Sequence, residues 1–442
     1  MTECNRAALS FSSLSRRKIS ADFDGGRLTS DAGGLLLREV DRRMGLTRKL
    51  AACVTDPRDP AKVVHDVRTM LAQRIFAIAM GYEDLNDHDT LRNDPVMQLL
   101  AEQAPDVGAQ QLASPATLCR FENRITRQSL ARMSGVLVDL FIASFRRPPK
   151  KLVLDFDATD DRVHGDQEKK FFHGYYDHYC FLPLYVFCGE RLLCAYLRPS
   201  NIDPAQHSRP ILRLLVNRLR ERWPKVKIIF RADGGFCRWK TLKYCDESDV
   251  GYVVGIARNQ VLERLAEPFA ASAQAAFDET GDKQRHFDEV YYAAKTWDRE
   301  RRVIVKAEHL KKGANTRFVV TNLAHAPKRV YDDWYTPRGE MENRIKEQQL
   351  GLFADRTSCH RFIANQLRLL LASAAYVLIE HLRREGLRGT ELARAQVSTI
   401  RLKLLKIAAR VRTSVRRIVL HLSSGYPYQQ LLRRLIARLT PI

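Results

Sequence analysis

The sequence predicts an α/β protein with a mixed β-sheet and flanking helices, interrupted by a β-rich insertion and preceded by an N-terminal helical domain. Residues 151–259 show the pattern β-β-β-α-β-α-β. Strands joined first by short turns and then through helices give a sheet of mixed direction. Residues 30–147 carry apolar residues at helical spacing. Three strand-like runs with polar turns lie between residues 261 and 330.

The N-terminal helices end with a short helix at SPATLCRFENRI (114–125). Ser114 is a favourable cap and Pro115 suits the first helical position. Arg120 and Arg124 would then lie on neighbouring turns. Two interpretations stay open: a recognition helix, or a packing helix with a solvated basic face. The prolines in RRPPKK (146–151) end the helical region, because proline cannot continue a helix.

The core and insertion strands are short apolar runs separated by turn residues. The expected strands are KLVLDFDAT (151–159), CFLPLYVFCG (180–189), ERLLCAYLRP (190–199), KVKIIFRADGG (225–235), GYVVGIARN (251–259), FDEVYYAAKTW (287–297), RRVIVKAEH (301–309) and TRFVVTNLA (316–324). Helices are expected at 203–224, 237–248, 335–350 and 360–385. Residues 1–20 are expected to be loose.

The C-terminal tail has no acidic residue after Glu391. Its eleven basic residues, half of the net +22, are Arg394, Arg401, Lys403, Lys406, Arg410, Arg412, Arg416, Arg417, Arg433, Arg434 and Arg438. The runs IRLKLL (400–405) and VRTSVRRIVLHL (411–422) predict a basic hairpin, followed by a short helix at 428–439.

These patterns divide the chain into five parts. They are the helical region (1–148), the first part of the core (149–260), the β-rich insertion (261–330), the last part of the core with an acidic helix and a packing helix (331–390), and the basic tail (391–442).

The net charge indicates the class of binding partner, and the cysteine content indicates the cellular compartment. A net charge of +22 over 442 residues favours a polyanion, through phosphate contacts and counterion release. No run approaches the ~18 apolar residues of a membrane helix, and the start lacks the apolar core of a signal peptide. The nine cysteines form no C-x-x-C pair, so we expect reduced thiols in the cytoplasm and no structural zinc.

Two aspartates follow apolar, β-branched runs that would hold them still. In LVLDFDATDD (152–161), Asp155 and Asp157 share one strand face, opposite Leu154 and Phe156. A buried carboxylate is costly unless it is paired or binds metal. Asp157 is the preferred candidate because it would end the strand, and Asp155 is the substitute.

Asp233 follows the run VKIIF (226–230) and precedes Gly234 and Gly235, which permit a sharp turn and leave room for a substrate. The alternative is an ordinary Asp-Gly turn.

The third acidic residue is Glu342 in YTPRGEMENRIKEQQ (335–349). Tyr335, Arg338 and Glu342 would share one helical face, since three and four residues separate them. Taken alone, the segment is also consistent with a surface helix and a salt bridge. Three carboxylates without a Cys/His cluster favour Mg²⁺ or Mn²⁺ over zinc. In a basic protein they predict an enzyme that cuts or joins nucleic acid.

The order and spacing of these motifs resemble the DDE transposases of bacterial insertion sequences. Tyr335, Arg338 and Glu342 match the Tyr-x2-Arg-x3-Glu-x6-Lys branch, with Gln349 at the lysine position and Lys346 the nearest basic residue. The segments GYEDLNDHDTLRNDP (81–95), SPATLCRFENRI (114–125), HGYYDHYCFLPLYVF (173–187) and RADGGF (231–236) are similar to the insertion-sequence-1380 family, over about residues 18–440.

This resemblance implies a ribonuclease-H-like core in which Asp157, Asp233 and Glu342 are catalytic and hold two Mg²⁺ (or Mn²⁺) ions. It implies cutting at transposon ends and joining of the 3′ ends to target DNA. The expected partners are double-stranded DNA, comprising inverted-repeat ends and target, and a second subunit on DNA. The expected location is the bacterial cytoplasm, on the nucleoid, without membrane attachment. Tyr335 and Arg338 would grip a phosphate.

The remaining DNA contacts are expected from Lys346, Arg120, Arg124, Arg412, Arg416 and Arg417. Two competing hypotheses stay open. One is a metal-dependent nuclease of the same fold that does not join ends. The other is an inert DNA-binding descendant, which the retention of all three carboxylates disfavours.

Overall fold

The computed structural model describes residues 9–106, 108 and 110–440. They form two compact units. The sheet unit comprises residues 48–55 and 121–380, and the helical unit comprises residues up to 47, 56–120 and those from 381 onward.

In the sheet unit, nine strands of the described residues form one mixed sheet, in the order β12-β13-β15-β11-β10-β4-β8-β9, with β14 paired to β13. The strands are β4 (Lys151–Ala158), β8 (Leu184–Cys188), β9 (Arg191–Tyr196), β10 (Lys227–Ala232), β11 (Val250–Ile256), β12 (Gln284–Tyr292), β13 (Arg301–Leu310), β14 (Gly313–Ala314) and β15 (Arg317–Thr321). The strands β4, β10 and β11 run parallel, and β8, β9, β15, β13 and β12 each pair antiparallel with their neighbours. The predicted mixed sheet is confirmed.

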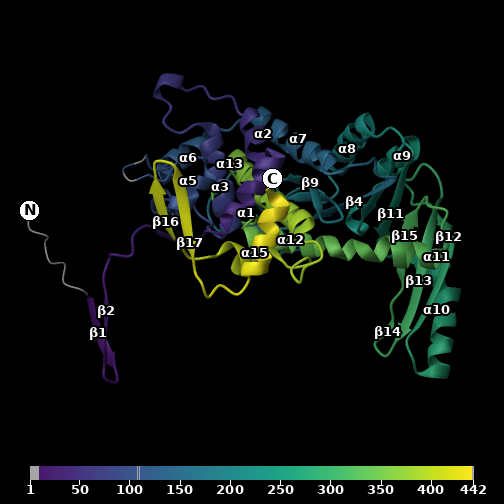
Figure 1. Ribbon diagram of the computed structural model, residues 1–442. Coiled ribbons are helices and arrows are strands. Elements are labelled where there is room, and N and C mark those ends of the chain that lie inside the picture. The colour runs from purple at the N-terminus through teal and green to yellow at the C-terminus, as the bar shows by residue number, and fades with distance from the viewer. Residues whose placement is uncertain (1–8, 107, 109, 441–442) are drawn as a thin grey trace, which may run out of the picture. The chain divides into compact units, whose positions relative to one another are not determined.

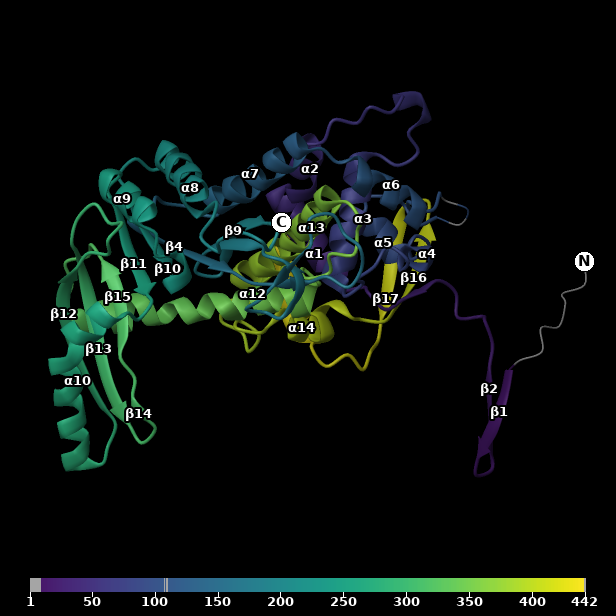
Figure 2. The same ribbon diagram turned by 180° about the vertical axis from the view of Figure 1, so that it is seen from behind.

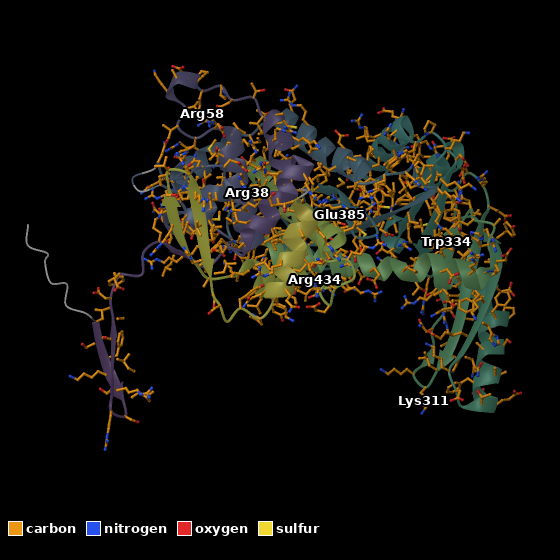
Figure 3. All side chains as sticks on the ribbon, in the orientation of Figure 1. Arg38, Arg58, Lys311, Trp334, Glu385 and Arg434 are labelled. Carbon is orange, nitrogen blue, oxygen red and sulfur yellow. The ribbon has the colours of Figure 1, made fainter. Side chains whose placement is uncertain are left out.

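The strands predicted between residues 287 and 324 are present, and they extend this same sheet because β15 pairs with β11. The sequence analysis missed the helix α10 (Gln260–Thr280), which precedes them and contains Pro268. This helix packs along β12 and β13 (Figure 1). Figure 3 shows Lys311 at the turn between β13 and β14.

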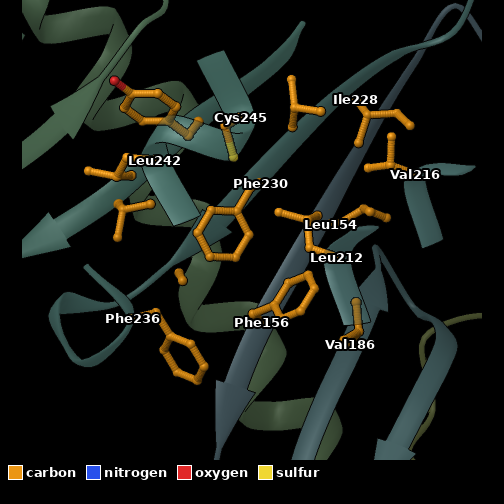
Figure 4. Packing of buried hydrophobic residues seen from close by; sticks show 14 of the residues in the cluster. Leu154, Phe156, Val186, Leu212, Val216, Ile228, Phe230, Phe236, Leu242 and Cys245 are labelled. Atoms are coloured by element: carbon orange, nitrogen blue, oxygen red, sulfur yellow. The ribbon is translucent and has the colours of Figure 1, made fainter. Parts of the chain in front are cut away.

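One face of the sheet is apolar and is covered by helices. Buried apolar side chains of the sheet and the helices form one cluster on this face. The helices that contribute to this cluster include α7 (Arg127–Ala143), α8 (Ser208–Arg222), α9 (Trp239–Glu247) and α10. Leu154, Phe156, Ile228 and Phe230 point into the cluster (Figure 4). The rings of Phe156 and Phe230 meet edge to face, with centroids 5.0 Å apart. Alternation along each strand therefore sends the intervening polar residues to the opposite face.

On that opposite face a nearly continuous helix runs from residue 327 to residue 352 (Figures 1 and 2). Its parts are α11 (Pro327–Arg329), a wide turn η3 (Val330–Tyr335), a tight turn η4 (Thr336–Arg338) and α12 (Gly339–Leu352). The predicted helix exists, but Tyr335 and Arg338 lie before α12, in the irregular turns. The irregularity includes Pro337, which has no N–H for a helical bond.

The helix α13 (Phe362–His381) is almost entirely buried. With the following turn η5 (Leu382–Gly386) it is long and apolar enough to cross a membrane by length and composition, and 89% of its most apolar window is buried. Gln366 accepts from the Leu197 amide at 2.7 Å and donates to the Ala195 carbonyl at 3.2 Å, so the helix is bound to the edge of β9.

The helical unit joins segments from both ends of the chain. Its helices are α1 (Gly34–Met44), η1 (Pro60–Lys62), α3 (Val67–Met80), α4 (His88–Leu91), α5 (Pro95–Leu100), η5, α14 (Val397–Ile400), η6 (Arg401–Leu405) and α15 (Gln429–Leu439), while α2 (Leu46–Ala52) and α6 (Pro115–Arg124) contain residues of both units. The strand β3 (Leu28–Thr29) pairs with β16 (Ala409–Ser414), which pairs with β17 (Arg417–Leu422).

Buried polar contacts fasten the tail within this unit. Asp31, 1% exposed, receives a hydrogen bond from the Tyr82 hydroxyl at 2.6 Å and an ion pair from Lys406 at 2.7 Å. Arg401 donates to the carbonyl oxygens of Ala79 and Ile78, at the end of α3. Some of the tail's charges are thus structural.

Two predicted segments differ from the structure. Residues 401–405 are helical, so IRLKLL is not a strand, and its apolar Leu404 and Leu405 are buried. The hairpin is formed by β16 and β17 alone. Residues 1–8 lie outside the described residues, but β1 (Leu9–Leu14) and β2 (Arg17–Ala21) form a hairpin where a loose segment was expected.

Replacing Phe230 with Ala is expected to lower the free energy of unfolding by about 3–5 kcal/mol, because it leaves a cavity at the centre of the apolar cluster. Urea denaturation followed by circular dichroism measures this. The exposed Leu350→Ala variant (Leu350 is 79% exposed) is the matched control and should change little. Equal stability of the two variants would contradict the central position of Phe230.

Candidate active site

Two aspartates end neighbouring parallel strands at the same edge of the sheet. The pairing of β4 with β10 ends at Phe156 and Ala232. Asp157 and Asp233 are the next residue on each strand. Asp157 is 8% exposed, and its backbone still pairs with Tyr185 on β8. Asp233 starts a tight turn, and its side chain accepts from the Gly235 amide at 2.9 Å. The strand register therefore brings the two predicted carboxylates side by side.

Asp155, the substitute for Asp157, has a different role. It lies on the same face but is paired with Arg231, which donates to both carboxylate oxygens, one of them at 2.8 Å. Arg231 also donates to the Trp334 carbonyl at 2.8 Å. The negative charge of Asp155 is thus neutralised by Arg231. Asp157 therefore remains the better candidate for the catalytic carboxylate. The sequence analysis did not identify Arg231, although its position two residues before Asp233 places it on the same strand face.

Arg338 links Glu342 to Asp157. The Arg338 guanidinium contacts Asp157 Oδ2 at 3.2 Å and Glu342 Oε1 at 3.0 Å. Glu342 lies in the first turn of α12, where the helix dipole favours a carboxylate, and its side chain is 51% exposed. The expected i,i+4 contact between Arg338 and Glu342 is present.

Tyr335 packs over the backbone beside Asp233. A Cβ atom added to Gly255 would lie 2.5 Å from the Tyr335 hydroxyl and 2.9 Å from the Gly234 amide nitrogen. Only glycine therefore leaves space for the tyrosine ring tip at this point of β11. The sequence analysis did not single out Gly255, although it follows three buried residues of a core strand.

The site brings three carboxylates close to one arginine, Arg338. Burial, together with the charges of Asp233 and Glu342, raises the pKa of Asp157 to about 7, although Arg338 opposes this rise. Burial lowers the pKa of Arg338, but the charges of Asp157, Tyr335 and the other acids leave it raised overall. The arginine acts as the internal counter-ion of the three carboxylates.

These oxygen donors fit a hard divalent cation. Crowded carboxylates with a raised pKa gain stability from a bound positive charge, and oxygen ligands suit Mg²⁺. In the described residues, no three His, Cys, Asp or Glu side chains are close enough to hold an ion as they stand. The Arg338 guanidinium lies between Asp157 and Glu342 and contacts both.

The α12 helix also carries Lys346 and Gln349, which follow Glu342 in the sequence. Lys346 is exposed. Gln349, at the lysine position of the resembled motif, donates to the Asp160 carbonyl and to Asp161 Oδ1, both at 3.0 Å. Asp161 is fully buried, and this burial raises its pKa well above the usual range. The uncharged Gln349 amide gives this buried carboxyl a hydrogen bond without adding a charge.

The other expected DNA-contacting residues are exposed. Arg120 and Arg124 are exposed on α6, whose Ser114 cap accepts from the Thr117 amide at 3.3 Å. Arg412, Arg416 and Arg417 are exposed on the β16–β17 hairpin of the helical unit. A separate cavity of about 610 Å³ in the sheet unit opens at the starts of β4 and β10, beside Lys151 and Trp334, at the opposite end of the strands from the carboxylates.

Comparison with known proteins identifies a family and structural relatives. The family model described as transposase DDE domain group 1 matches residues 11–442. No curated protein matches the chain. A solved structure that resembles it is a cryo-EM structure of a piggyBac transposase synaptic complex with hairpin DNA. The two chains are 10% identical with a TM-score of 0.43, and the match covers 85% of this chain and 80% of the other.

The raised pKa of Asp157 predicts a pH-dependent stability. Its folded pKa of about 7 exceeds the ordinary value of 3.8, so its contribution is most favourable below about pH 4 and is lost as the pH rises to about 7. In EDTA, Asp157→Asn should therefore be more stable than the unmodified protein at pH 8, by more than about 1 kcal/mol, and should lose this advantage at pH 4. Urea midpoints measure the difference, with the exposed Asp278→Asn as control. A constant difference across this pH range would refute the shift.

Proposed function

We propose a mechanism of DNA transposition for this chain, which belongs to the transposase DDE domain group 1 family. In this proposal the chain binds the ends of its own mobile element, cuts them and joins the 3′ ends to target DNA. The observation that carries it is the pairing register of β4 and β10, which sets Asp157 beside Asp233, with Glu342 linked to Asp157 by Arg338. A nucleic-acid substrate also agrees with the net charge of +22.

The core of the proposed enzyme is ribonuclease-H-like. Supporting it is the strand order β11-β10-β4-β8-β9, in which β4, β8 and β9 are neighbouring antiparallel strands and the later β10 and β11 add parallel to β4. We assign this core to residues 149–260 and 331–390, the insertion to 261–330, and DNA-binding roles to the helical region 1–148 and the tail 391–442.

Asp157, Asp233 and Glu342 are the proposed ligands of two Mg²⁺ ions, with Mn²⁺ as the substitute. Such ions supply the charge that activates the attacking oxygen and stabilises the leaving oxygen of a phosphodiester. The protein's own part is positioning: β4 and β10 fix the two aspartates, while α12 brings Glu342 through its first turn. Most of the catalytic effect in phosphoryl transfer comes from such positioning and charge stabilisation.

Arg338 and Tyr335 have the proposed role of holding the phosphate. Arg338 now binds two carboxylates, and cations at those carboxylates would leave its forked guanidinium free for phosphate oxygens. Tyr335 keeps its hydroxyl beside Asp233, over Gly255. Burial raises the pKa of Tyr335, which keeps it a hydrogen-bond donor at neutral pH.

The proposed partners are double-stranded DNA and a second copy of the chain. Inverted-repeat ends and target DNA would be contacted by Lys346, Arg120, Arg124 and the tail arginines. Cutting of two ends calls for a homodimer on DNA. We place the protein in the insertion-sequence-1380 group and in the bacterial cytoplasm, on the motifs described above.

Asp233→Asn is expected to abolish cleavage and joining while DNA binding stays within about twofold, because the phosphate contacts lie elsewhere. Cleavage of a duplex bearing the element's end is measured in Mg²⁺, and binding by gel shift in Ca²⁺. The exposed Asp278→Asn variant is the matched control and should cleave normally. Full cleavage by Asp233→Asn would refute the site, and cleavage without joining in the unmodified protein would indicate a nuclease.

Replacing Arg412, Arg416 and Arg417 with Ala is expected to weaken binding to specific and random duplexes alike. Each lost phosphate contact should reduce the slope of log affinity against log salt by about 0.9. Fluorescence anisotropy over a salt series measures both quantities. The triple Lys variant keeps the charge and should keep the slope, whereas an unchanged slope in the Ala variant would show that the DNA path lies elsewhere.

A further inference from the structure

A small hairpin rich in aromatic residues follows β4, the strand that carries Asp157. It comprises β5 (Asp161–Arg162), β6 (Phe171–His173) and β7 (His178–Phe181), which form a separate three-stranded sheet. The hairpin is tied to the end of β4 where His178 Nε2 contacts Asp160 Oδ2 at 2.8 Å. Since Asp160 is three residues from Asp157, the hairpin's turn lies beside the proposed active site.

Most rings of this hairpin have a structural role. Phe172 and Tyr179 are paired across the strands with centroids 5.7 Å apart, which stabilises a two-stranded hairpin. Tyr176 lies within the turn, 4.9 Å from the ring of His173 and 6.1 Å from that of His178. Each of these rings supports the strand pairing or fills the turn.

Tyr175 at the tip of the turn has no such role. It is 86% exposed, and among the described residues its ring neighbour is Tyr176, at 5.0 Å and 86°. An edge-to-face contact of this kind leaves a face of Tyr175 open to solvent. A large ring on a short turn, with its face free, is suited to receive another flat ring.

We propose that Tyr175 is a stacking site for an unpaired nucleobase of the DNA strand at the reacting end. This inference rests on the proposed function, because DNA at Asp157 is what brings a base to the turn. Stacking on an aromatic ring requires a base released from its pair, and every base has a suitable face. Exposed Arg162 on β5 offers a charge for the neighbouring phosphate. The site would therefore hold the strand end open at the point of cutting.

The test compares a blunt DNA duplex with the same duplex bearing a single-stranded extension that contains 2-aminopurine. The full-length protein is used in Ca²⁺, which prevents cleavage. Anisotropy gives the affinities, and quenching of 2-aminopurine reports stacking. The unmodified protein should bind the extended duplex about tenfold more tightly than the blunt one. Tyr175→Ala should lose this preference and the quenching, with unchanged affinity for the blunt duplex.

Two variants serve as controls. Tyr175→Phe keeps the ring and should keep the preference, and Tyr291→Ala removes a comparably exposed ring (63%) from β12 and should change nothing. The inference is overturned if Tyr175→Ala keeps the preference for the extended duplex, or if the unmodified protein lacks it. In either case, binding to the blunt duplex leaves the proposed function standing. Failure to bind either duplex overturns both. A change in sedimentation mass in Tyr175→Ala, with DNA preference intact, would make the turn a contact between copies and also overturn it.

Discussion

The buried ion pair between Arg231 and Asp155 is the interaction on which the site depends. It joins β4 to β10 at paired positions, and the same guanidinium holds the Trp334 carbonyl, next to Tyr335. One side chain thus connects the two strands and the helix that bear the site. Such a pair adds little net stability, because desolvation offsets the attraction, but a wrong register would leave a charge buried and unpaired. Its contribution is to make one register far better than the others.

That register places two carboxylates close together, and their repulsion must be offset by other residues of the site. Two strands that end at the same edge place Asp157 and Asp233 together, and burial makes the charge on Asp157 costly. Arg338 relieves the conflict from a short irregular turn, outside the regular part of the helix. Arg338 thus lies in the tight turn η4, whereas the buried Asp157 lies on strand β4.

The sequence was most informative where local pattern decides the structure. Alternation in 152–157 correctly placed Asp155 and Asp157 on the face opposite Leu154, and the glycines after Asp233 marked a turn. Pairing between distant segments was not readable: neither the partner of Asp155 nor the one of Gln349 follows from spacing. The wide and tight turns around Pro337 and the helical form of residues 401–405 were also missed, since tertiary packing overrides weak local preference there. The helix α10 was missed although its alanine-rich sequence and its Asn259 cap favour a helix.

The helical unit has a consequence for how the protein is made. Its strand β3 and its buried Asp31 lie near the start of the chain, but their partners, Ala409 in β16 and Lys406, are translated near the end. The sheet unit is complete once residue 380 has left the ribosome. Domains fold as they emerge, so Asp31 has no lysine partner until residue 406 has been synthesised. A prematurely terminated chain would therefore retain every proposed catalytic carboxylate but could not close the unit that holds the basic tail in place.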